Sequence, residues 1–228
     1  MKQKPGWVLP DLKEAQKRTT NTIDRIDTFT IPEVARMMGR GKTYFISTYG
    51  CQANERDSET LAGILDELGF TPNETAEGSD VIIINTCAIR QNAEEKVLGE
   101  IGNFKRLYRE NKDLIIGVCG CMAQEEGLVE TLLTKYPQVR LLFGTHNIQE
   151  LPSMLYSCMF EGKKVVKIYS KEGEVYENLP VHRFGTFKAW VNIMYGCDKF
   201  CTYCIVPYTR SSRLIQQEER PIEWAASI

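Results

Sequence analysis

Residues 80–87 read DVIIINTC, a β-branched run that ends beside a cysteine. A run of this length is too short for a buried helix, and it predicts a buried strand over residues 80–85. Similar strands are predicted before and after it, and a helix follows each of them. Strands that alternate with helices predict an α/β domain with a doubly wound parallel sheet. The predicted strands are 43–48, 80–85, 114–118 and 139–143, and the predicted helices are about 54–68, 93–109 and 124–135, with another after Asn147.

The composition of the 228-residue chain is that of an ordinary folded protein, with 43% apolar residues and 28 Lys and Arg against 30 Asp and Glu. This balance gives no global reason to expect a polyanionic partner. The charged N-terminus lacks the apolar core of a signal peptide, so we expect a cytoplasmic protein with no membrane partner. Eight cysteines in such a chain favour metal binding or catalysis over disulfides, and two histidines are too few for a histidine-built hydrolase or zinc site.

Three cysteines follow the ends of three predicted strands. Cys51, Cys87 and Cys121 recur at intervals of 36 and 34 residues, each in a turn that contains Gly or Asn. Parallel strands end at one edge of their sheet, where doubly wound folds place ligand sites, so these thiols are predicted to converge. Converging thiolates favour zinc, copper(I) or an iron-sulfur cluster. Cys119 closes an apolar strand and Cys158 lies in an apolar helix, and both are predicted to be inert core residues.

A second group of cysteines lies within one short loop. Cys197, Cys201 and Cys204 follow a predicted strand and Gly196 with the spacing C-x3-C-x2-C. Structural zinc sites usually have four protein ligands. A four-iron cluster held by three cysteines keeps one iron open, and an open position is what a substrate or cosubstrate requires.

The C-x3-C-x2-C spacing resembles the signature of radical S-adenosylmethionine enzymes. The flanking sequence, over about residues 42–210, resembles the MiaB-type tRNA methylthiotransferases. Two departures from the family are Ala53, where relatives commonly carry Met, and the segment after Arg210, where relatives continue with Gly and a basic run. The matching motifs are YGCQ at 49–52 with Asn54, NTCAIR at 85–90, GVCGCMAQ at 117–124 and MYGCDKFCTYCIVPYTR at 194–210.

The resemblance implies two 4Fe-4S clusters and S-adenosyl-L-methionine as cofactors. It implies that Cys51, Cys87 and Cys121 bind an auxiliary cluster, and that Cys197, Cys201 and Cys204 bind the cluster that generates a radical from S-adenosylmethionine. The implied reaction converts N6-isopentenyladenosine beside the anticodon to its 2-methylthio form at the adenine C2 carbon. The implied partners are a tRNA substrate and a one-electron reductant such as flavodoxin. No residue is assigned a catalytic role.

The predicted domain organisation is an N-terminal extension, an auxiliary-cluster domain, a connector and the first strand and cluster loop of an incomplete radical-SAM (β/α) barrel. Only 24 residues follow Cys204, whereas a full (β/α)8 barrel takes about 250. We therefore expect a truncated or frame-altered form that lacks the rest of the barrel and the family's RNA-binding module and has no turnover alone. The predicted boundaries are 1–41, 42–160, 161–186 and 187–228, with short strand-like pieces at 163–169 and 174–177 and a barrel strand at 188–194.

Other functions are compatible with parts of this pattern. A non-enzymatic iron-sulfur electron-transfer or scaffold protein is one alternative, although four cysteine ligands are expected for simple electron transfer. A zinc-binding interaction module is disfavoured by the ligand count. Within the family, relatives act on other modified adenosines or on a ribosomal protein. Arg210 and Lys199 are candidates for contact with substrate or cosubstrate.

Overall fold

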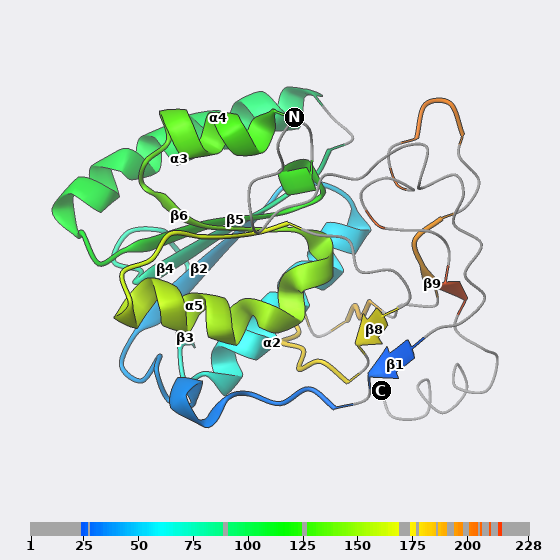
Figure 1. Ribbon diagram of the computed structural model, residues 1–228, viewed down its shortest axis with the longest axis horizontal. Helices are drawn as coiled ribbons and strands as arrows, with labels where there is room; N and C mark the ends of the chain where they lie inside the picture. The colour runs from blue at the N-terminus through cyan, green and yellow to red at the C-terminus, as the bar shows by residue number, and fades with distance from the viewer. Residues whose placement is uncertain are drawn as a thin grey trace.

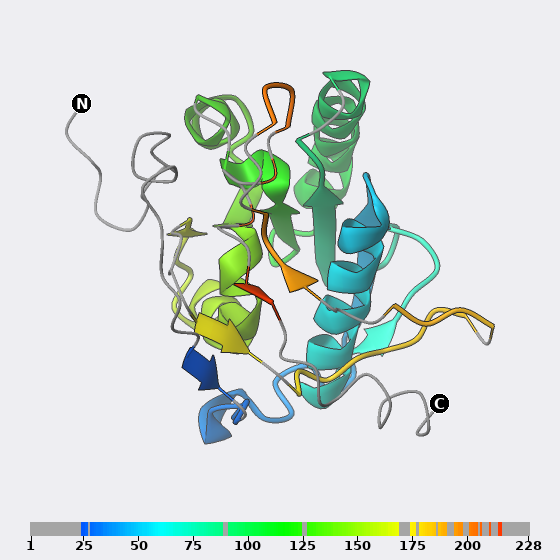
Figure 2. The ribbon, with the colours of Figure 1, turned by 90° about the vertical axis from the view of Figure 1, so that its right-hand side faces the viewer.

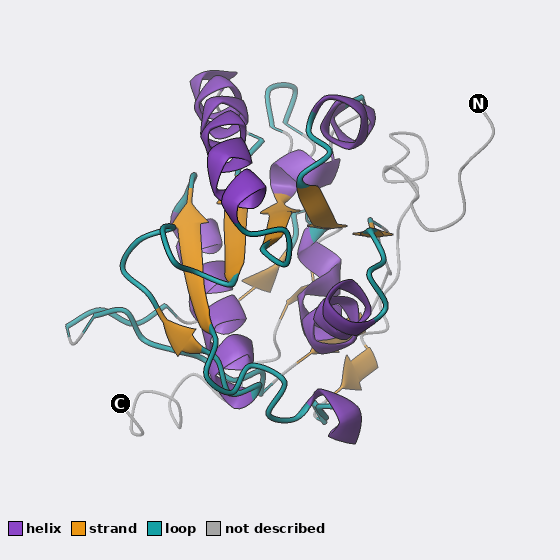
Figure 3. Cartoon of the chain, turned by 90° about the vertical axis from the view of Figure 1, so that its left-hand side faces the viewer, coloured by secondary structure: helices purple, strands orange, loops and turns teal. Residues whose placement is uncertain are grey.

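The structure is a computed structural model in which helices cover both faces of one parallel sheet (Figure 1). The pair α3 and α4 covers one face, and the pair α2 and α5 covers the other, as the view turned by 90° also shows (Figure 3). The predicted doubly wound α/β fold is therefore confirmed. The structure describes residues 24–26, 28–88, 91–124, 127–168, 174–176, 178–185, 187–190, 194–197, 201–204, 206, 210 and 214–215.

The described part of the chain forms a six-stranded sheet in the order β3-β2-β4-β5-β6-β7, and every pairing in it is parallel. The strands β4 and β5 are buried along their whole length. Central parallel strands are covered on both faces, which explains their continuous apolar sequences. The four predicted strands are confirmed to within two residues at each end. The strands are β2 Thr43–Thr48, β3 Thr71–Pro72, β4 Val81–Thr86, β5 Ile115–Gly120, β6 Val139–Phe143 and β7 Val165–Lys167.

The two edge strands extend the sheet beyond the four predicted strands. The strand β3 has only two residues, both exposed, so no alternating pattern marks it. The strand β7 lies inside the predicted connector, yet it pairs with β6, so the sheet continues past residue 160. Its three residues are half-buried at the edge and carry no long apolar run. The domain boundaries themselves stay predictions.

The helices lie close to their predicted positions, with one interruption. Within the predicted helix 124–135, α4 begins only at Leu128, because Gly127 adopts a left-handed φ of 82° immediately before it. A short 3-10 turn, η2, precedes it directly after β5. The helices are α2 Gln52–Glu67, α3 Gln91–Glu110, α4 Leu128–Lys135 and α5 Leu151–Phe160, and the 3-10 turns are η1 Glu33–Ala35, η2 Cys121–Gln124 and η3 Thr145–Glu150.

The core consists of two apolar layers, one on each face of the sheet. Successive side chains of β4 point to opposite faces, so Ile83 joins the layer under α2 and α5, whereas Ile82 and Ile84 join the layer under α3 and α4. On α3, Val97 and Ile101 are fully buried, as their helical spacing predicts. These layers hold the strand ends at fixed positions.

Two short strand pairs lie outside the main sheet. The strand β1, Asp24–Ile26, pairs in parallel with β8, Glu174–Tyr176, and β9, Met194–Tyr195, pairs antiparallel with β10, Leu214–Ile215. Of the predicted barrel strand 188–194, residues 188–190 form no strand, and residues 191–193 lie outside the described part. The barrel start stays a prediction. No helix in the described ranges is long and apolar enough to span a bilayer.

Candidate metal centre at the carboxyl edge of the sheet

The first three cysteines lie at the carboxyl ends of three neighbouring strands. Cys51 is the N-cap residue of α2, just beyond β2. Cys87 directly follows β4, and Cys121 begins η2 directly after β5. Because β2, β4 and β5 are adjacent and parallel, their ends meet at one edge. The predicted placement of the three cysteines at the strand ends is therefore confirmed, and none of the eight cysteines, all of which lie in the described ranges, forms a disulfide.

Cys51 and Cys87 are in direct contact. A hydrogen bond from Cys87 is the main reason why the pKa of Cys51 falls to about 5, and it outweighs the effect of burial, which raises that pKa. The backbone N–H groups of Asn54 and Ala53 and the charge of Arg210 lower it further. Cys51 is therefore a thiolate at neutral pH, the form that binds metals. Its position at a helix N-terminus has the same effect.

The turn before Cys51 requires a glycine. Gly50 has a φ of 147°, which residues other than glycine rarely adopt. A Cβ atom at this position would lie 2.5 Å from the Cβ atom of Cys87 and 2.7 Å from the Asn54 side chain. Glycine thus lets the turn after β2 approach the turn after β4 closely enough for the two thiols to touch.

A buried polar network holds these turns together. The Asn54 amide donates to the Asn85 side chain at 3.0 Å and to the carbonyl of Thr86 at 2.8 Å. In return, the Asn85 amide donates to the carbonyl of Asn54 and to the hydroxyl of Ser58, both at 2.9 Å. The Thr86 hydroxyl donates to the carbonyl of Cys119 at 2.5 Å. The network joins the start of α2 to the ends of β4 and β5, and such satisfied buried networks specify one arrangement.

Arg210 connects the third cysteine to α2. Its Nε donates to Cys121 Sγ at 3.2 Å, and a terminal nitrogen donates to Asp57 Oδ2 at 2.6 Å. The Arg210 side chain is 19% exposed and that of Asp57 is 7% exposed, so this ion pair is largely buried. The charge of Arg210 also lowers the pKa of Cys51, so this guanidinium acts on two of the three cysteines. The expected substrate contact of Lys199 lies outside the described residues.

The remaining two cysteines of the first domain are buried, as predicted for inert core residues. Burial, together with the charges of Asp57 and Cys121, holds the pKa of Cys119 well above its usual range, and Arg210 offsets this only in part. Burial likewise raises the pKa of Cys158 to about 11. Both side chains therefore stay protonated at neutral pH, and neutral thiols are poor metal ligands.

The donor set at the sheet edge is suited to a soft metal centre, and it includes a thiolate that is already ionised. In the described ranges, no three His, Cys, Asp or Glu side chains lie close enough together to hold a single metal ion. Thiolates on one ion with bonds of about 2.3 Å must lie within about 4 Å of each other. A cubane cluster binds each cysteine through a different iron and spaces its ligands more widely. Ligation by these three cysteines stays a prediction.

Two cysteines of the second group, Cys201 and Cys204, lie in one turn. The N–H of Cys204 donates to the carbonyl of Cys201 at 2.9 Å. Cys201 is exposed, whereas Cys197 and Cys204 are partly buried. The intervening Tyr203 is 91% exposed, so it does not pack against the core. Residues 198–200 lie outside the described part of the chain, and this site also stays a prediction.

The sequence reasoning missed a set of contacts between α2 and a later segment of the chain. This segment, residues 180–185 and 187–190, is called the strap below. The strap passes beside α2 in Figure 2. Lys188 Nζ and Trp190 Nε1 both donate to Glu55, at 2.7 and 3.1 Å. Arg183 pairs with Glu59, whose side chain is only 6% exposed.

The strap also packs directly on the backbone of α2. The N–H of His182 donates to the carbonyl of Glu59 at 2.9 Å, and its Nδ1 lies 2.6 Å from Asp66 Oδ2. A Cβ atom on Gly63 would lie 2.5 Å from backbone atoms of the strap at Pro180. Residues 55, 59, 63 and 66 recur at helical spacing and form one stripe of α2. The sequence signal that could have indicated these contacts is the acidic stripe of α2, which is interrupted by a glycine.

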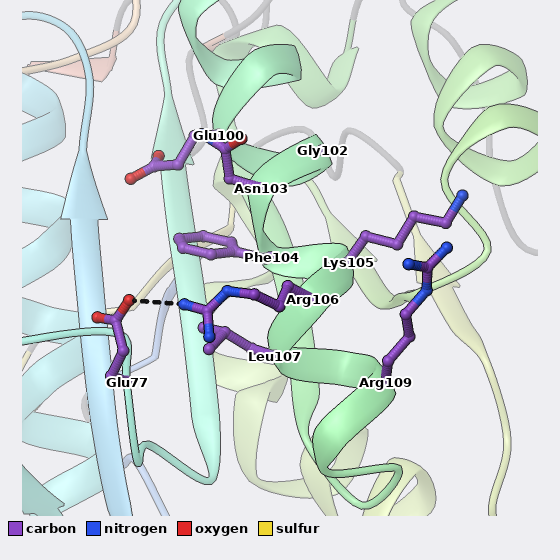
Figure 4. A pocket seen from close by; sticks show the side chains of 9 residues that line it. All are labelled: Glu77, Glu100, Gly102, Asn103, Phe104, Lys105, Arg106, Leu107 and Arg109. Atoms are coloured by element: carbon purple, nitrogen blue, oxygen red, sulfur yellow. Dashed lines mark hydrogen bonds and ion pairs between the residues drawn. The ribbon is translucent and has the colours of Figure 1, made fainter.

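A separate hollow of about 650 Å³ lies beside α3 (Figure 4). Arg106 donates across it to Glu77 at 3.3 Å and also pairs with Glu110 along the helix. Both pairs are well exposed to solvent. The lining contains no cysteine, so the hollow is distinct from both thiol groups.

Comparison with known proteins bears on the family. Residues 43–144, which include Cys51, Cys87 and Cys121, match the model of the Uncharacterized protein family UPF0004. The chain is 54% identical over 214 residues to tRNA-2-methylthio-N(6)-dimethylallyladenosine synthase of Geobacillus thermodenitrificans, covering 94% of this chain and 41% of that relative. Proteins of the same name from Staphylococcus saprophyticus and Bacillus licheniformis are 55% and 52% identical, over 94% and 95% of this chain and 42% and 43% of theirs.

The chain is therefore similar to tRNA-2-methylthio-N(6)-dimethylallyladenosine synthases over most of its own length. It spans about two fifths of the length of these relatives. The family match contains the carboxyl edge of the sheet from Cys51 to Cys121. The similarity to the relatives extends over most of the chain, so it is not confined to the N-terminal sheet.

Proposed function

We propose that this chain is part of a radical S-adenosylmethionine enzyme that methylthiolates tRNA. The observation that carries the proposal is the convergence of Cys51, Cys87 and Cys121 at one sheet edge, together with the C-x3-C-x2-C spacing of Cys197, Cys201 and Cys204 in the sequence. The names of the relatives support the same activity. The activity, substrate and partners of the whole enzyme are proposals, because the chain spans only part of the relatives' length.

The proposed substrate is N6-isopentenyladenosine beside the anticodon, and the proposed product is its 2-methylthio derivative. The printed name of the relatives specifies a 2-methylthio group and an N6-dimethylallyl group on adenosine, and dimethylallyl and isopentenyl describe the same substituent here. Identity above 50% over most of this chain favours this substrate over the other modified adenosines and the ribosomal protein on which more distant relatives act. The proposed location is the cytoplasm, in agreement with a tRNA substrate.

The two groups of cysteines are the proposed ligands of two 4Fe-4S clusters. Cys51, Cys87 and Cys121 would hold the auxiliary cluster, and Cys197, Cys201 and Cys204 would hold the second cluster with its open iron for S-adenosyl-L-methionine. When bound, these groups supply the radical and the sulfur chemistry. The protein holds these groups and sets their orientation.

The residues around the auxiliary site have distinct tasks in this proposal. Cys51 arrives as a thiolate, so iron need not displace its proton. Gly50 lets the Cys51 turn approach Cys87. Asn54 and Asn85 hold the turns through buried hydrogen bonds, as partners behind metal ligands commonly do.

The 228-residue chain by itself is expected to bind clusters without completing the reaction. The relatives are more than twice as long as the segment that this chain matches. In the full reaction, a one-electron reductant such as flavodoxin would supply the electron. These expectations are tested by adding S-adenosylmethionine and reductant to the reconstituted chain, and normal turnover would contradict them.

The test of the cluster proposal is iron and sulfide quantitation after anaerobic reconstitution. The wild-type chain should bind about eight irons, and Cys51→Ala and Cys201→Ala should each lose about half of them. Cys158→Ala is the matched control, because it removes a buried thiol outside both groups and should keep the full iron content. A Cys51→Ala variant with the iron content of the wild type would refute the assignment of the auxiliary site.

A further inference from the structure

Arg210 joins two parts of the chain that are far apart in sequence. It lies six residues after Cys204, at the end of the segment that contains the second group of cysteines. Its side chain, however, reaches the first group. One guanidinium edge donates to Cys121 Sγ, and a terminal nitrogen donates to Asp57 on α2. The same side chain thus links α2, the turn after β5 and the second cysteine loop.

The surroundings show that this contact is built into the fold. Asp57 is nearly buried and lies in the second turn of α2, the helix that Cys51 caps. Arg56 also approaches Asp57, but at 3.6 Å, whereas Arg210 approaches it at 2.6 Å. A buried carboxylate requires a close cation, because an unpaired buried charge is strongly destabilising. Asp57 therefore fixes the guanidinium, and the planar fork leaves its Nε directed at the Cys121 sulfur.

We propose that Arg210 is a positioning residue of the auxiliary cluster site, which donates a charged N–H···S hydrogen bond to Cys121 and anchors the second cysteine loop to α2. The inference rests on the proposed binding of a cluster by Cys51, Cys87 and Cys121. Each bound thiolate brings negative charge to the sheet edge, and Arg210 places a fixed positive charge beside Cys121 that also acts on Cys51. Hydrogen bonds to cluster sulfurs and nearby charge are main determinants of cluster potential.

The consequence is an effect on the cluster that a purely structural residue would not have. A positive charge and an N–H···S bond stabilise the reduced, more negative form of a cluster, so they raise its reduction potential. Lysine keeps the charge but lacks the planar fork, so it cannot reach Cys121 and Asp57 with the same geometry. Arg210→Lys should therefore restore only part of the effect.

The experiment uses the full chain in a Cys201→Ala background, which is expected to hold only the auxiliary cluster. Iron content, EPR spectra of the reduced cluster and its reduction potential are measured for the parent and for Arg210→Gln, Arg210→Lys and Asp57→Asn. Arg106→Gln is the matched control, because it removes an exposed arginine from the hollow beside α3. Circular dichroism checks that each variant is folded.

In the proposed role, Arg210→Gln lowers the reduction potential of the bound cluster and speeds the loss of iron to a chelator about tenfold. Asp57→Asn, which releases the guanidinium, should also speed the loss of iron, by less, and this measurement keeps the test decisive if Arg210→Gln does not fold. Its reduction potential is not compared, because the loss of the negative charge of Asp57 raises the potential by itself. Arg106→Gln behaves as the parent. A folded Arg210→Gln with the parent's potential and spectrum overturns the inference. A parent that binds no iron refutes the auxiliary site itself, and the inference falls with it.

Discussion

Replacing Gly63 by alanine tests whether the strap is held on α2. In an exposed helix interior, alanine stabilises a protein by about 1 kcal/mol relative to glycine. At Gly63 the new Cβ atom would lie 2.5 Å from backbone atoms at Pro180 and Val181, about 1 Å closer than an ordinary contact. Backbone cannot rotate out of the way as a side chain can, so the strap must move from the helix.

The size of the effect follows from the contacts that the movement breaks. Glu59 accepts the N–H of His182 at its carbonyl and the Arg183 guanidinium at its nearly buried carboxylate. A hydrogen bond to a charged group contributes about 1.5–3 kcal/mol, so the strap should open more easily by about 2 kcal/mol. An opening that is easier by this amount raises the rate of proteolysis roughly 30-fold when closing is fast.

The assay is limited trypsin digestion under native conditions, with cleavage after Arg183 and Lys188 followed by mass spectrometry. Gly102→Ala is the matched control, because a Cβ atom on that α3 glycine would meet nothing within 4 Å. Gly102→Ala should leave these cleavage rates unchanged and raise the melting temperature. The reasoning is refuted if Gly63→Ala stabilises the chain as Gly102→Ala does and the strap is cleaved at the wild-type rate.

Two further predictions concern the thiols of the sheet edge. Gly50→Ala should abolish iron binding at the auxiliary site, because of its φ and its approach to Cys87. Gly78→Ala, with a φ of 77° but open space around it, controls for backbone strain alone, and equal iron loss in both variants would contradict the steric explanation. In the metal-free chain, alkylation of Cys51 should stay fast down to pH 6 and fall as the pH drops through about 5, since protonation removes the thiolate. Cys158, with a pKa raised to about 11 and no exposure, should stay unmodified over that range by mass spectrometry, and its early modification would contradict the assigned burial.

The sequence predicts most of the sheet because burial leaves a local signature. The strands β4 and β5 are covered on both faces, and each reads as an unbroken apolar run. Edge strands have no such signature, and β7, with its half-buried Val165–Lys167, appeared only as a strand-like piece of a connector. The position of the cysteines at the carboxyl edge was also predictable. Once the strands are parallel, their order alone brings Cys51, Cys87 and Cys121 to one side of the sheet.

The contacts that surround the cysteines could not be predicted in the same way. Asn54 and Asn85 are 31 positions apart in the sequence. Arg210 is 89 positions from Cys121 and farther still from Asp57. Nothing local distinguishes a buried asparagine from one in a solvated turn, or a cation that pairs with Asp57 from one that binds substrate. Long-range polar pairing is decided by tertiary packing, so a sequence can indicate the ligands of a site more readily than the residues that orient them.

Helix α2 is the element on which both proposed cluster sites depend. Its N-terminus presents Cys51, its second turn holds Arg210 through Asp57, and its acidic stripe holds the strap that leads toward the second cysteine loop. A shift of α2 would therefore move the auxiliary ligands and the anchor of the second loop together. This coupling gives a physical reason for the two buried acids of α2, Asp57 and Glu59, because ion pairs of fixed geometry specify one docking position where apolar contacts would permit sliding. It follows that substitutions that remove the charges of the acidic stripe of α2 should change the distance between the two proposed cluster sites more than they lower the stability of the sheet.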